Sequence, residues 1–387
     1  MKKIKIIHVA SFTGNIGDNA NHSGFRRLFD ETFSDYSTEW TDYEIRETYW
    51  GNKKFDAEFV KLVNSFDLLV FGGGNYFELW VETSVTGCSI DISKECLENI
   101  KPPIFYNSLG VDPAQGVTEE SISKFERFLA QSIEKKSFIS CRNDGSSNAI
   151  KQFLNPKYGS HIYRTVDAGL FANVSQDVDY PEICSESKNI VFQFAKDMES
   201  IRWPGNDGYL DYEGFLAEIT KVINCLTDTY NVIFVPHIYS DISIINDVLV
   251  RVDDKARRTS ISVAPYLVGD KGQKYIFGLY QKADLICGTR FHSNIVSYGL
   301  NKKLIPLVNY RQIKELVSEL GVEGDAVQIN KPGFSSVLMK KVVDKINCSS
   351  VEQNNISEML SNYKTFLKNV ELWYRGSVED ASKSRTS

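Results

Sequence analysis

The sequence predicts an α/β protein made of two Rossmann-like, doubly wound domains followed by a C-terminal helical extension. Short apolar runs of strand length alternate with helical periodicity over most of the 387 residues. Such alternation is typical of parallel sheets that are covered by helices on both faces. A polar stretch near the middle divides the alternation into two series, and a chain of this length fits two domains of roughly 150–200 residues each.

The first series contains four near-continuous apolar runs, and the helix that precedes the last of them has a clear start. Thr118 is a suitable N-cap, and Glu119 and Glu120 follow it in the first turn, so a helix is predicted over 118–135. The predicted strands of this series are residues 4–10, 68–71, 104–107 and 138–141.

The second series begins after the polar stretch 181–188, which is the best candidate for a linker. Its helix 212–229 carries apolar residues on one face, and its predicted strands are residues 190–194, 232–235, 260–263, 285–287 and 304–308. We therefore expect an N-terminal domain at 1–184, a C-terminal domain at 185–335 and helices in 336–387, with a frayed polar tail at 380–387.

The composition excludes several classes of function. The net charge of −6 disfavours nucleic acid as a partner, because phosphate backbones select for clustered Lys and Arg. The seven cysteines are scattered and form no C-x-x-C pair, so neither a disulfide framework nor a metal site is predicted. No segment is long enough to span a membrane, and free cysteines suit a cytoplasmic location.

Glycines follow the first two predicted strands, where a Rossmann-like domain binds its ligands. The first loop contains Gly14, Asn15 and Gly17, with Asp18 entering a helix. Glycines let the backbone approach a ligand, and free N–H groups at a helix start favour an anion. The alternative is an ordinary turn between a strand and a helix, with Asp18 as the N-cap.

The second loop places three glycines in succession, Gly72, Gly73 and Gly74, after the strand at 68–71. A surface without side chains favours the close approach of a ligand or of another domain. A turn that needs a positive φ angle is the alternative explanation.

The densest polar group follows the strand at 285–287, where Arg290 and His292 stand two residues apart at the start of a helix. Arginine offers a planar fork for a carboxylate or a phosphate, and histidine exchanges a proton near neutral pH. A structural histidine is the alternative for His292. His237 with Asp241 forms a similar but weaker pair after the strand at 232–235.

Taken in order, these motifs resemble those of the polysaccharide pyruvyltransferase family over about residues 4–325. The resemblance implies a fold similar to the two-domain GT-B glycosyltransferases. It also implies transfer of the pyruvyl group of phosphoenolpyruvate to a hexose of a cell-surface polysaccharide or of its lipid-linked precursor, at the inner face of the membrane. The matching blocks are 14–18, 72–74, Arg142 to Ser146, 167–171, 283–293 and Pro306 to Tyr310.

The resemblance implies that Arg290 and His292 belong to the phosphoenolpyruvate site. From the chemistry of ketal formation, we expect His292 to be the general acid and Asp18 to be the base or an acceptor-positioning residue. The expected contacts of phosphoenolpyruvate are Arg290, Ser293, Asn294 and Lys196, supported by the backbone of Gly14, Asn15, Gly17 and Gly72–Gly74, with His237, Tyr310 and Lys314 as secondary candidates. Lys196 and Lys314 depart from the family pattern, since an Arg is expected at the first position and a Lys one residue before the second.

Two other functions fit the same residues. A GT-B glycosyltransferase could hold the diphosphate of a nucleotide sugar with the glycine loops and Arg290. A non-catalytic sugar-binding relative would retain the fold without the chemistry, because a fold alone does not prove a function. Phosphoenolpyruvate is expected as a co-substrate, and no other cofactor is predicted.

Overall fold

The computed structural model describes residues 2–174, 178–348 and 355–383, which form two compact units. The described residues of the first unit come from Met1–Thr13, His22–Ala168 and Ser357–Ser387, and those of the second unit come from Gly14–Asn21 and Gly169–Ile356. The division differs from the predicted boundaries, because residues 169–184 belong to the second unit and the chain returns to the first unit at its end. Each unit has its own hydrophobic core.

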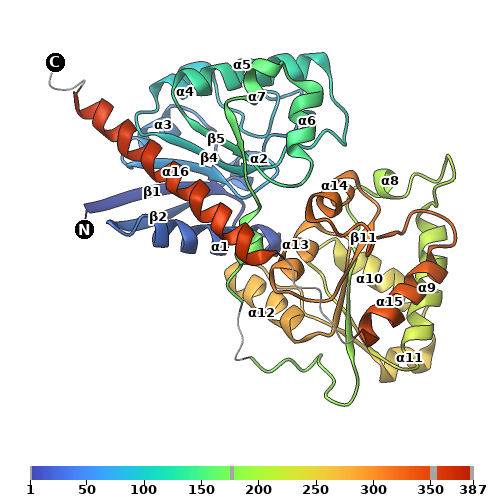
Figure 1. Cartoon of the computed structure of the whole chain (residues 1–387). Helices are drawn as coiled ribbons and strands as arrows, with labels where there is room; N and C mark the ends of the chain where they lie inside the picture. Colours follow the sequence, from blue (N-terminus) through green and yellow to red (C-terminus); the bar gives the residue numbers. More distant parts are fainter. Residues whose placement is uncertain (1, 175–177, 349–354, 384–387) are drawn as a thin grey trace. The chain divides into compact units, whose positions relative to one another are not determined.

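The first unit contains a parallel sheet with the strand order β2-β1-β3-β4-β5-β6 (Figure 1). The predicted strands β1, β3, β4 and β5 are confirmed, and β2 and β6 are additions at the two edges of the sheet. The strands are β1 (Lys2–Ala10), β2 (Tyr36–Glu44), β3 (Leu68–Gly72), β4 (Ile104–Leu109), β5 (Phe138–Cys141) and β6 (Ile162–Arg164).

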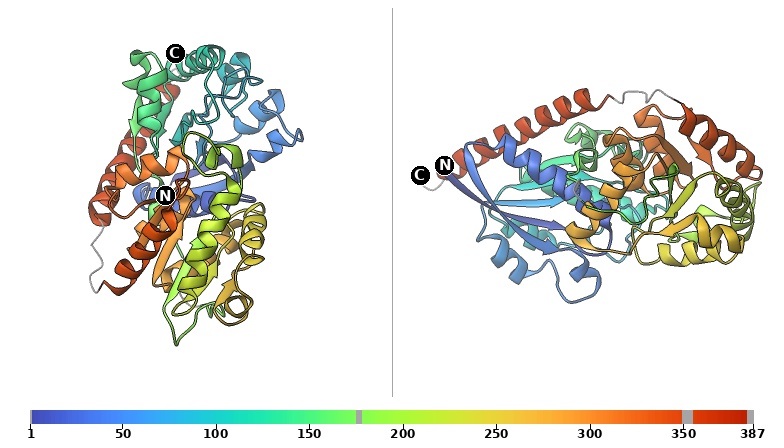
Figure 2. Two further views of the ribbon diagram at one scale, coloured as in Figure 1. Left: turned by 90° about the vertical axis from the view of Figure 1, so that its right-hand side faces the viewer. Right: turned by 90° about the horizontal axis from the view of Figure 1, so that it is seen from below.

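Helices cover both faces of this sheet. Successive side chains of a strand point to opposite faces, and neighbouring residues of β4 show it. Phe105 contacts Phe25 of α1 (Ile16–Thr32) and Phe366 of α16 (Ile356–Lys383). Tyr106 contacts Phe128 of α5 (Glu119–Glu134) on the other face. Figures 1 and 2 show the long α16 running along the sheet.

The second unit contains a parallel sheet with the order β12-β11-β10-β7-β8-β9. Numbered within the unit and read from the other edge, this is the 3-2-1-4-5-6 order of a Rossmann fold. The strands are β7 (Asn189–Gln193), β8 (Asn231–Phe234), β9 (Ile261–Val263), β10 (Leu285–Gly288), β11 (Leu304–Val308) and β12 (Val327–Gln328).

One core of the second unit joins the sheet to three helices. Phe192 and Phe194 cluster with Phe215 of α9 (Tyr212–Leu226), Ile244 of α10 (Asp241–Leu249) and Leu338 of α15 (Phe334–Asn347). The remaining helices are α2 (Arg46–Tyr49), α3 (Ala57–Val63), α4 (Lys94–Asn99), α6 (Ser146–Phe153), α7 (Pro156–Gly159), the 3₁₀ turn Ala168–Phe171, α8 (Glu199–Arg202), α11 (Asp254–Thr259), α12 (Gly269–Lys282), α13 (Phe291–Gly299) and α14 (Arg311–Leu320).

The predicted helical extension is present, but its two helices belong to different units. The α15 helix joins the second core, whereas α16 lies on the first sheet, where Trp373 donates to the carbonyl of Lys136 at 2.8 Å and Arg375 pairs with Asp35 at 2.6 Å. Residues 380–383 are helical, so the prediction of a frayed tail from 380 is wrong for them. Residues 384–387 lie outside the described part of the chain.

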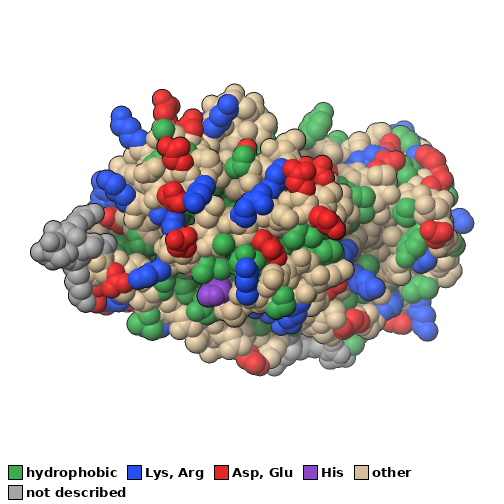
Figure 3. Space-filling model, turned by 90° about the horizontal axis from the view of Figure 1, so that it is seen from above, with side chains coloured by type: hydrophobic (Ala, Val, Ile, Leu, Met, Phe, Trp, Pro, Cys, Tyr) green, Lys and Arg blue, Asp and Glu red, His purple; other side chains and the backbone are tan. Residues whose placement is uncertain are grey.

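The surface carries both signs of charge. On the face drawn in Figure 3, Lys and Arg side chains of the described residues are interspersed with Asp and Glu side chains. Within the described segments, each helix is too short or too polar to cross a bilayer. Cys141 in β5 and Cys287 in β10 are both buried.

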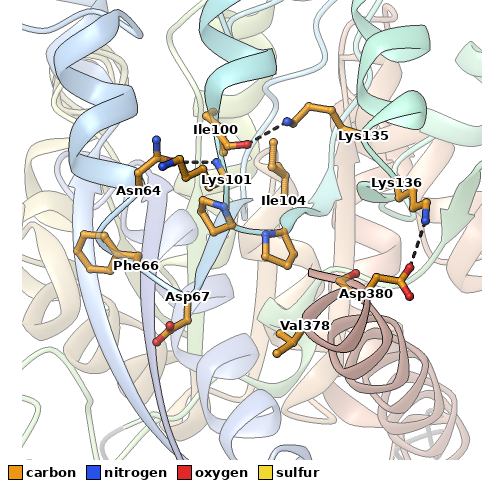
Figure 4. Close-up of a pocket in the computed structure, with 13 residues that line it drawn as sticks. Asn64, Phe66, Asp67, Ile100, Lys101, Ile104, Lys135, Lys136, Val378 and Asp380 are labelled. Atoms are coloured by element: carbon orange, nitrogen blue, oxygen red, sulfur yellow. Dashed lines mark hydrogen bonds and ion pairs between the residues drawn. The ribbon is translucent and has the colours of Figure 1, made fainter. Parts of the chain in front are cut away.

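A cavity of about 410 Å³ lies at the amino-terminal edge of the first sheet, where Asp67 precedes β3 (Figure 4). Two of its lysines already have partners, because Lys135 donates to the Ile100 carbonyl at 2.9 Å and Lys136 pairs with Asp380 at 3.2 Å. Ligands of open α/β sheets bind beyond the carboxyl ends of the strands. The candidate site is therefore sought at the opposite edge of each sheet.

Candidate functional site

The strand order of the second unit creates a site at the carboxyl ends of β7 and β10. These strands are neighbours in the sheet although about ninety residues separate them, with Gln193 opposite Gly288. The order of the sheet reverses at this point, which is where ligands bind in such folds. The residues that follow the two strands, including Asp197 and Arg290, are thereby brought together.

Arg290 is held by two carboxylates. Its Nε donates to Asp241 at 2.8 Å, and its Nη2 donates to Asp241 and to Asp197, each at 2.5 Å. Burial alone would lower the pKa of Arg290, but Asp241 and then Asp197 outweigh it and hold that pKa above its ordinary value. The guanidinium group therefore stays charged in a largely enclosed position.

A second arginine shares one of these carboxylates. Arg202 lies 3.8 Å from Asp197, donates to Asn309 at 2.9 Å and stands over the ring of Tyr310 at 4.9 Å. Burial would raise the pKa of Asp197, but Arg290 and Arg202 outweigh it and lower that pKa. Two arginines and two aspartates thus form a cluster with no net formal charge.

Asp241 organises the inner side of this cluster. It is fully buried, and its carboxylate also accepts the backbone N–H of His237 at 3.0 Å and the side-chain amide of Gln193 at 3.3 Å. These donors fix the orientation of the carboxylate, which in turn fixes the plane of Arg290. The position of the Arg290 fork is therefore set by hydrogen bonds and not only by packing.

His237 is a buried ring inside the second unit. Its Nε2 lies 2.8 Å from the hydroxyl of Tyr280, and Phe277 contacts its ring edge. Burial, followed by the charges of Arg290 and His292, keeps the pKa of His237 well below its ordinary value. His237 is therefore neutral at physiological pH.

His292 lies in the first turn of α13, and the first turn of α1 packs against it. His292 is 5% exposed. A Cβ atom built on Gly17 would lie 2.4 Å from Cγ and Nδ1 of His292. Only a glycine lets the backbone come this close to the ring. The structure therefore brings together two motifs that were predicted separately and that lie far apart in the sequence.

The loop after β1 uses its polar groups to start α1. Gly14 has a φ angle of +93°, and the Asn15 side chain accepts the N–H of Gly17 at 3.0 Å. Asn15 is therefore the N-cap, which corrects the alternative prediction that assigned this role to Asp18. Asp18 lies inside the first turn of α1 and is 8% exposed.

Ser293 and Asn294 shape the turn between β10 and α13. The Ser293 hydroxyl donates to the Arg290 carbonyl at 2.8 Å. The Asn294 amide donates to the same carbonyl at 2.7 Å and to the Gly288 carbonyl at 3.0 Å. These bonds help to position Arg290, and the contact of Ser293 and Asn294 with phosphoenolpyruvate stays a prediction.

The predicted lysines have other surroundings. The Lys196 ammonium lies 2.6 Å from Glu199 and 3.3 Å from the ring centroid of Tyr212, so it forms an ion pair apart from the two aspartates that hold Arg290. Lys314 is exposed on α14. Tyr310 is buried and contacts Arg202. The cation that shares Asp197 with Arg290 is Arg202, and the contact of Lys196 with phosphoenolpyruvate stays a prediction.

The glycines of residues 72–74 serve the interior of the first unit. Gly73 has a φ angle of +78°. A Cβ atom on Gly74 would lie 2.3 Å from the ring of Tyr76, whose hydroxyl accepts the N–H of Ser11 at 2.8 Å. The positive φ angle and the bulk of Tyr76 give Gly73 and Gly74 structural roles, and the contact of these glycines with a ligand stays a prediction.

Sequence reasoning missed Asp197, Arg202 and Gln193. Gln193 is the last residue of β7, and Asp197 follows it by four positions, so both stand at a strand end where polar residues were being sought. Arg202 ends the one-turn helix α8, which has no apolar periodicity to reveal it. Its proximity to Asp197 depends on the turn between them.

Solved structures support the GT-B-like fold at low sequence identity. The chain is similar to UDP-GlcNAc 2-epimerase from Neisseria meningitidis (11% identity, TM-score 0.59, covering 94% of this chain and 100% of that one). It is also similar to UDP-GlcNAc 2-epimerase from Methanocaldococcus jannaschii (10%, 0.51, 94% and 99%) and to a glycosyltransferase from Rickettsia africae (12%, 0.53, 99% and 99%). At these identities the likeness concerns the fold alone.

No curated protein matches the sequence. The family model described as polysaccharide pyruvyl transferase matches residues 15–310, which include Gly17, the aspartate–arginine cluster and His292. This match covers most of the chain, and the chain belongs to the polysaccharide pyruvyl transferase family.

Proposed function

Starting from this family membership, we propose that the protein transfers the pyruvyl group of phosphoenolpyruvate to two hydroxyl groups of a hexose, forming a cyclic ketal. The acceptor is a cell-surface polysaccharide or its lipid-linked precursor, modified in the cytoplasm at the inner face of the membrane. The observation that carries the proposal is the convergence of Gly17, Arg290 and His292 in the second unit, within the segment that the family model matches.

The reaction needs one proton delivered and two removed. Protonation of the methylene carbon of phosphoenolpyruvate creates an oxocarbenium-like centre at the adjacent carbon. One sugar hydroxyl attacks that centre and loses its proton. The C–O bond to the phosphate then breaks, and inorganic phosphate leaves with the bonding electrons. The second hydroxyl attacks the same carbon, loses its proton and closes the ketal. We assign delivery of the first proton to His292, a role for which general acid catalysis supplies about 10²–10⁴-fold.

Arg290 is the proposed anion-binding group. Asp241 is fully buried, whereas 29% of the Asp197 side chain is exposed. An incoming phosphate or carboxylate would displace Asp197 and leave the Asp241 fork in place, because bidentate arginine pairs are the stronger contacts. Arg202, which also contacts Asp197, would stabilise the bound anion. Asp18 remains our proposal for acceptor positioning or for the base.

Incubation with phosphoenolpyruvate and candidate acceptors, followed by measurement of phosphate release, tests the proposal. Donor binding should also stabilise the fold by RT ln(1 + [L]/Kd), or about 2.7 kcal/mol at a hundredfold excess over Kd. A melting temperature that is raised by a nucleotide sugar but not by phosphoenolpyruvate would instead support the glycosyltransferase alternative. A fold stabilised by saccharides alone would support a non-catalytic relative.

His292→Ala tests the proton donor. Turnover should fall by about 10²-fold or more, with donor binding little changed because Arg290 remains. In deuterated water, the wild-type enzyme should place deuterium in the methyl group of the ketal. Near-normal turnover of a folded His292→Ala variant would remove His292 from this role and make His237 the next residue to test.

A further inference from the structure

The connection between β3 and α4 is long, irregular and internally hydrogen-bonded. It spans residues 73–93 and starts at the carboxyl end of β3. The Thr86 hydroxyl donates to the Ile90 carbonyl at 2.8 Å, and the Asp91 side chain accepts the N–H of Val85 at 2.8 Å. Long connections inside compact domains are usually functional when they are ordered. We call this ordered segment, residues 73–93, the wall.

A cavity of about 550 Å³ lies between this wall and the segment that follows β2. Its volume is in the range of small-molecule sites, roughly 300–1,000 Å³. Both bounding segments follow the carboxyl ends of strands, and all lining residues belong to the first unit. Its polar lining is rich in hydroxyl groups, which come from Thr48, Tyr49, Thr83, Ser84, Ser89 and Ser93.

Tyr49 offers an exposed ring at this cavity. The residue is 51% exposed, yet its hydroxyl group hydrogen bonds to Ser89. Burial of that hydroxyl, and then the nearby carboxyl of Glu78, raise the pKa of Tyr49 above its ordinary value. The ring is therefore anchored at its inner end while part of its surface remains open to the cavity.

Ser89 connects the cavity to a carboxyl group beneath it. The Ser89 hydroxyl donates to Oε2 of Glu78. Burial raises the pKa of Glu78 to about 8, with Asp112 adding to the shift while Ser89, Arg142 and Arg46 oppose it. At neutral pH this carboxyl is mostly protonated, so Glu78 and Ser89 can both donate and accept hydrogen bonds.

This combination matches the chemistry of a saccharide. A pyranose ring has an apolar C–H face, which suits an exposed aromatic ring, and a rim of hydroxyl groups that both donate and accept. Resting on the function proposed above, we propose that this cavity binds a hexose unit of the acceptor, with the Tyr49 ring against the sugar face and Ser89 bonded to a sugar hydroxyl.

The test measures binding in the absence of donor. Methyl glycosides of glucose, galactose, mannose, N-acetylglucosamine and N-acetylmannosamine are titrated at millimolar concentrations against the full-length protein, with saturation-transfer NMR as the readout. At least one glycoside should bind. Tyr49→Ala and Ser89→Ala should each weaken its binding by about tenfold, which corresponds to about 1.4 kcal/mol.

Tyr163→Ala provides a matched control. Tyr163 is 50% exposed, belongs to the same unit, and lies on β6 stacked on Phe138. Its removal should leave glycoside binding unchanged. Binding that is equally weakened in all three variants would overturn the proposal, as would glycoside binding that survives in Tyr49→Ala, or the failure of every glycoside to bind the wild type.

The donor separates this proposal from the proposed function. Phosphoenolpyruvate should raise the melting temperature of wild type and of Tyr49→Ala equally, because Tyr49 is not a donor contact. Glycoside binding that depends on Tyr49, in a protein that does not respond to phosphoenolpyruvate, would keep the saccharide site and reject the pyruvyl transfer. Phosphate release with an unchanged acceptor KM in Tyr49→Ala would keep the pyruvyl transfer and reject the saccharide site.

Discussion

Replacement of Gly17 by alanine tests the contact on which the candidate site depends. The new Cβ atom would lie 2.4 Å from two ring atoms of His292 and 2.5 Å from its Cβ. Carbon atoms prefer separations of about 3.5–4.0 Å, so the ring or the helix must move by about 1 Å. His292 is buried, and forced overpacking costs about 1–3 kcal/mol.

The higher helix propensity of alanine opposes this loss of stability, but it is the smaller of the two effects. Alanine is better than glycine in a helix by at most about 1 kcal/mol, so Gly17→Ala should still lose up to about 2 kcal/mol of stability. Displacing a catalytic group by about 1 Å can also cost about 10²-fold in turnover. We expect both losses, measured by urea unfolding and by phosphate release with phosphoenolpyruvate and an acceptor.

Gly376→Ala is the matched control, because Gly376 is also helical and a Cβ atom there would meet nothing within 4 Å. This variant should be more stable than wild type by about 0.5–1 kcal/mol, with unchanged turnover. If Gly17→Ala behaved in the same way, the proximity of Gly17 to His292 would be refuted.

Three further variants probe the rest of the molecule. Arg290→Lys keeps the charge but loses the fork on Asp241, so donor-induced stabilisation should shrink while the protein remains folded; an undiminished shift in melting temperature would exclude Arg290 from the donor site. Gly299→Ala would place a Cβ atom 2.0 Å from the Leu170 carbonyl oxygen, and unfolding should show a loss of about 2–3 kcal/mol; unchanged stability would disprove that packing. The raised pKa of Glu78 means that the folded state binds its proton more tightly, so wild-type stability should fall between about pH 4.5 and 8, by about 1.4 kcal/mol for each pKa unit of the shift. Glu78→Gln should remove this fall. If urea unfolding gave the same change in stability between pH 5 and pH 8 for the variant and the wild type, the raised pKa of Glu78 would be contradicted.

The sequence predicts the buried strands well, but it missed the edge strands β2, β6 and β12 and found only β9 among the edge strands of the two sheets. The residues of β3 are all buried, so they form a continuous apolar run that identifies the strand. In β2, exposed and partly exposed residues such as Glu39 and Thr41 interrupt the pattern, because an edge strand meets solvent. The same reasoning explains why β12, with its two residues, was not found.

In the candidate site, the residues that share one strand end could be predicted from the sequence, and their partners from distant segments could not. Arg290 and His292 are visible in the sequence because they share one strand end. Their partners Asp197, Asp241 and Gly17 come from three other segments. The positions of these partners depend on the place of β7 beside β10 and on the packing of the first turn of α1. No local pattern encodes those distances.

The return of α16 to the first unit has a consequence for biosynthesis. A ribosome extends the chain from its N-terminus, and domains generally fold as units while they emerge. The second unit is complete once residue 356 has been made, but the first unit still lacks the helix that covers Phe105 and Phe138. The unit that is translated first is therefore the last to be finished, and its sheet must wait, with these two phenylalanines uncovered, through the synthesis of the whole second unit.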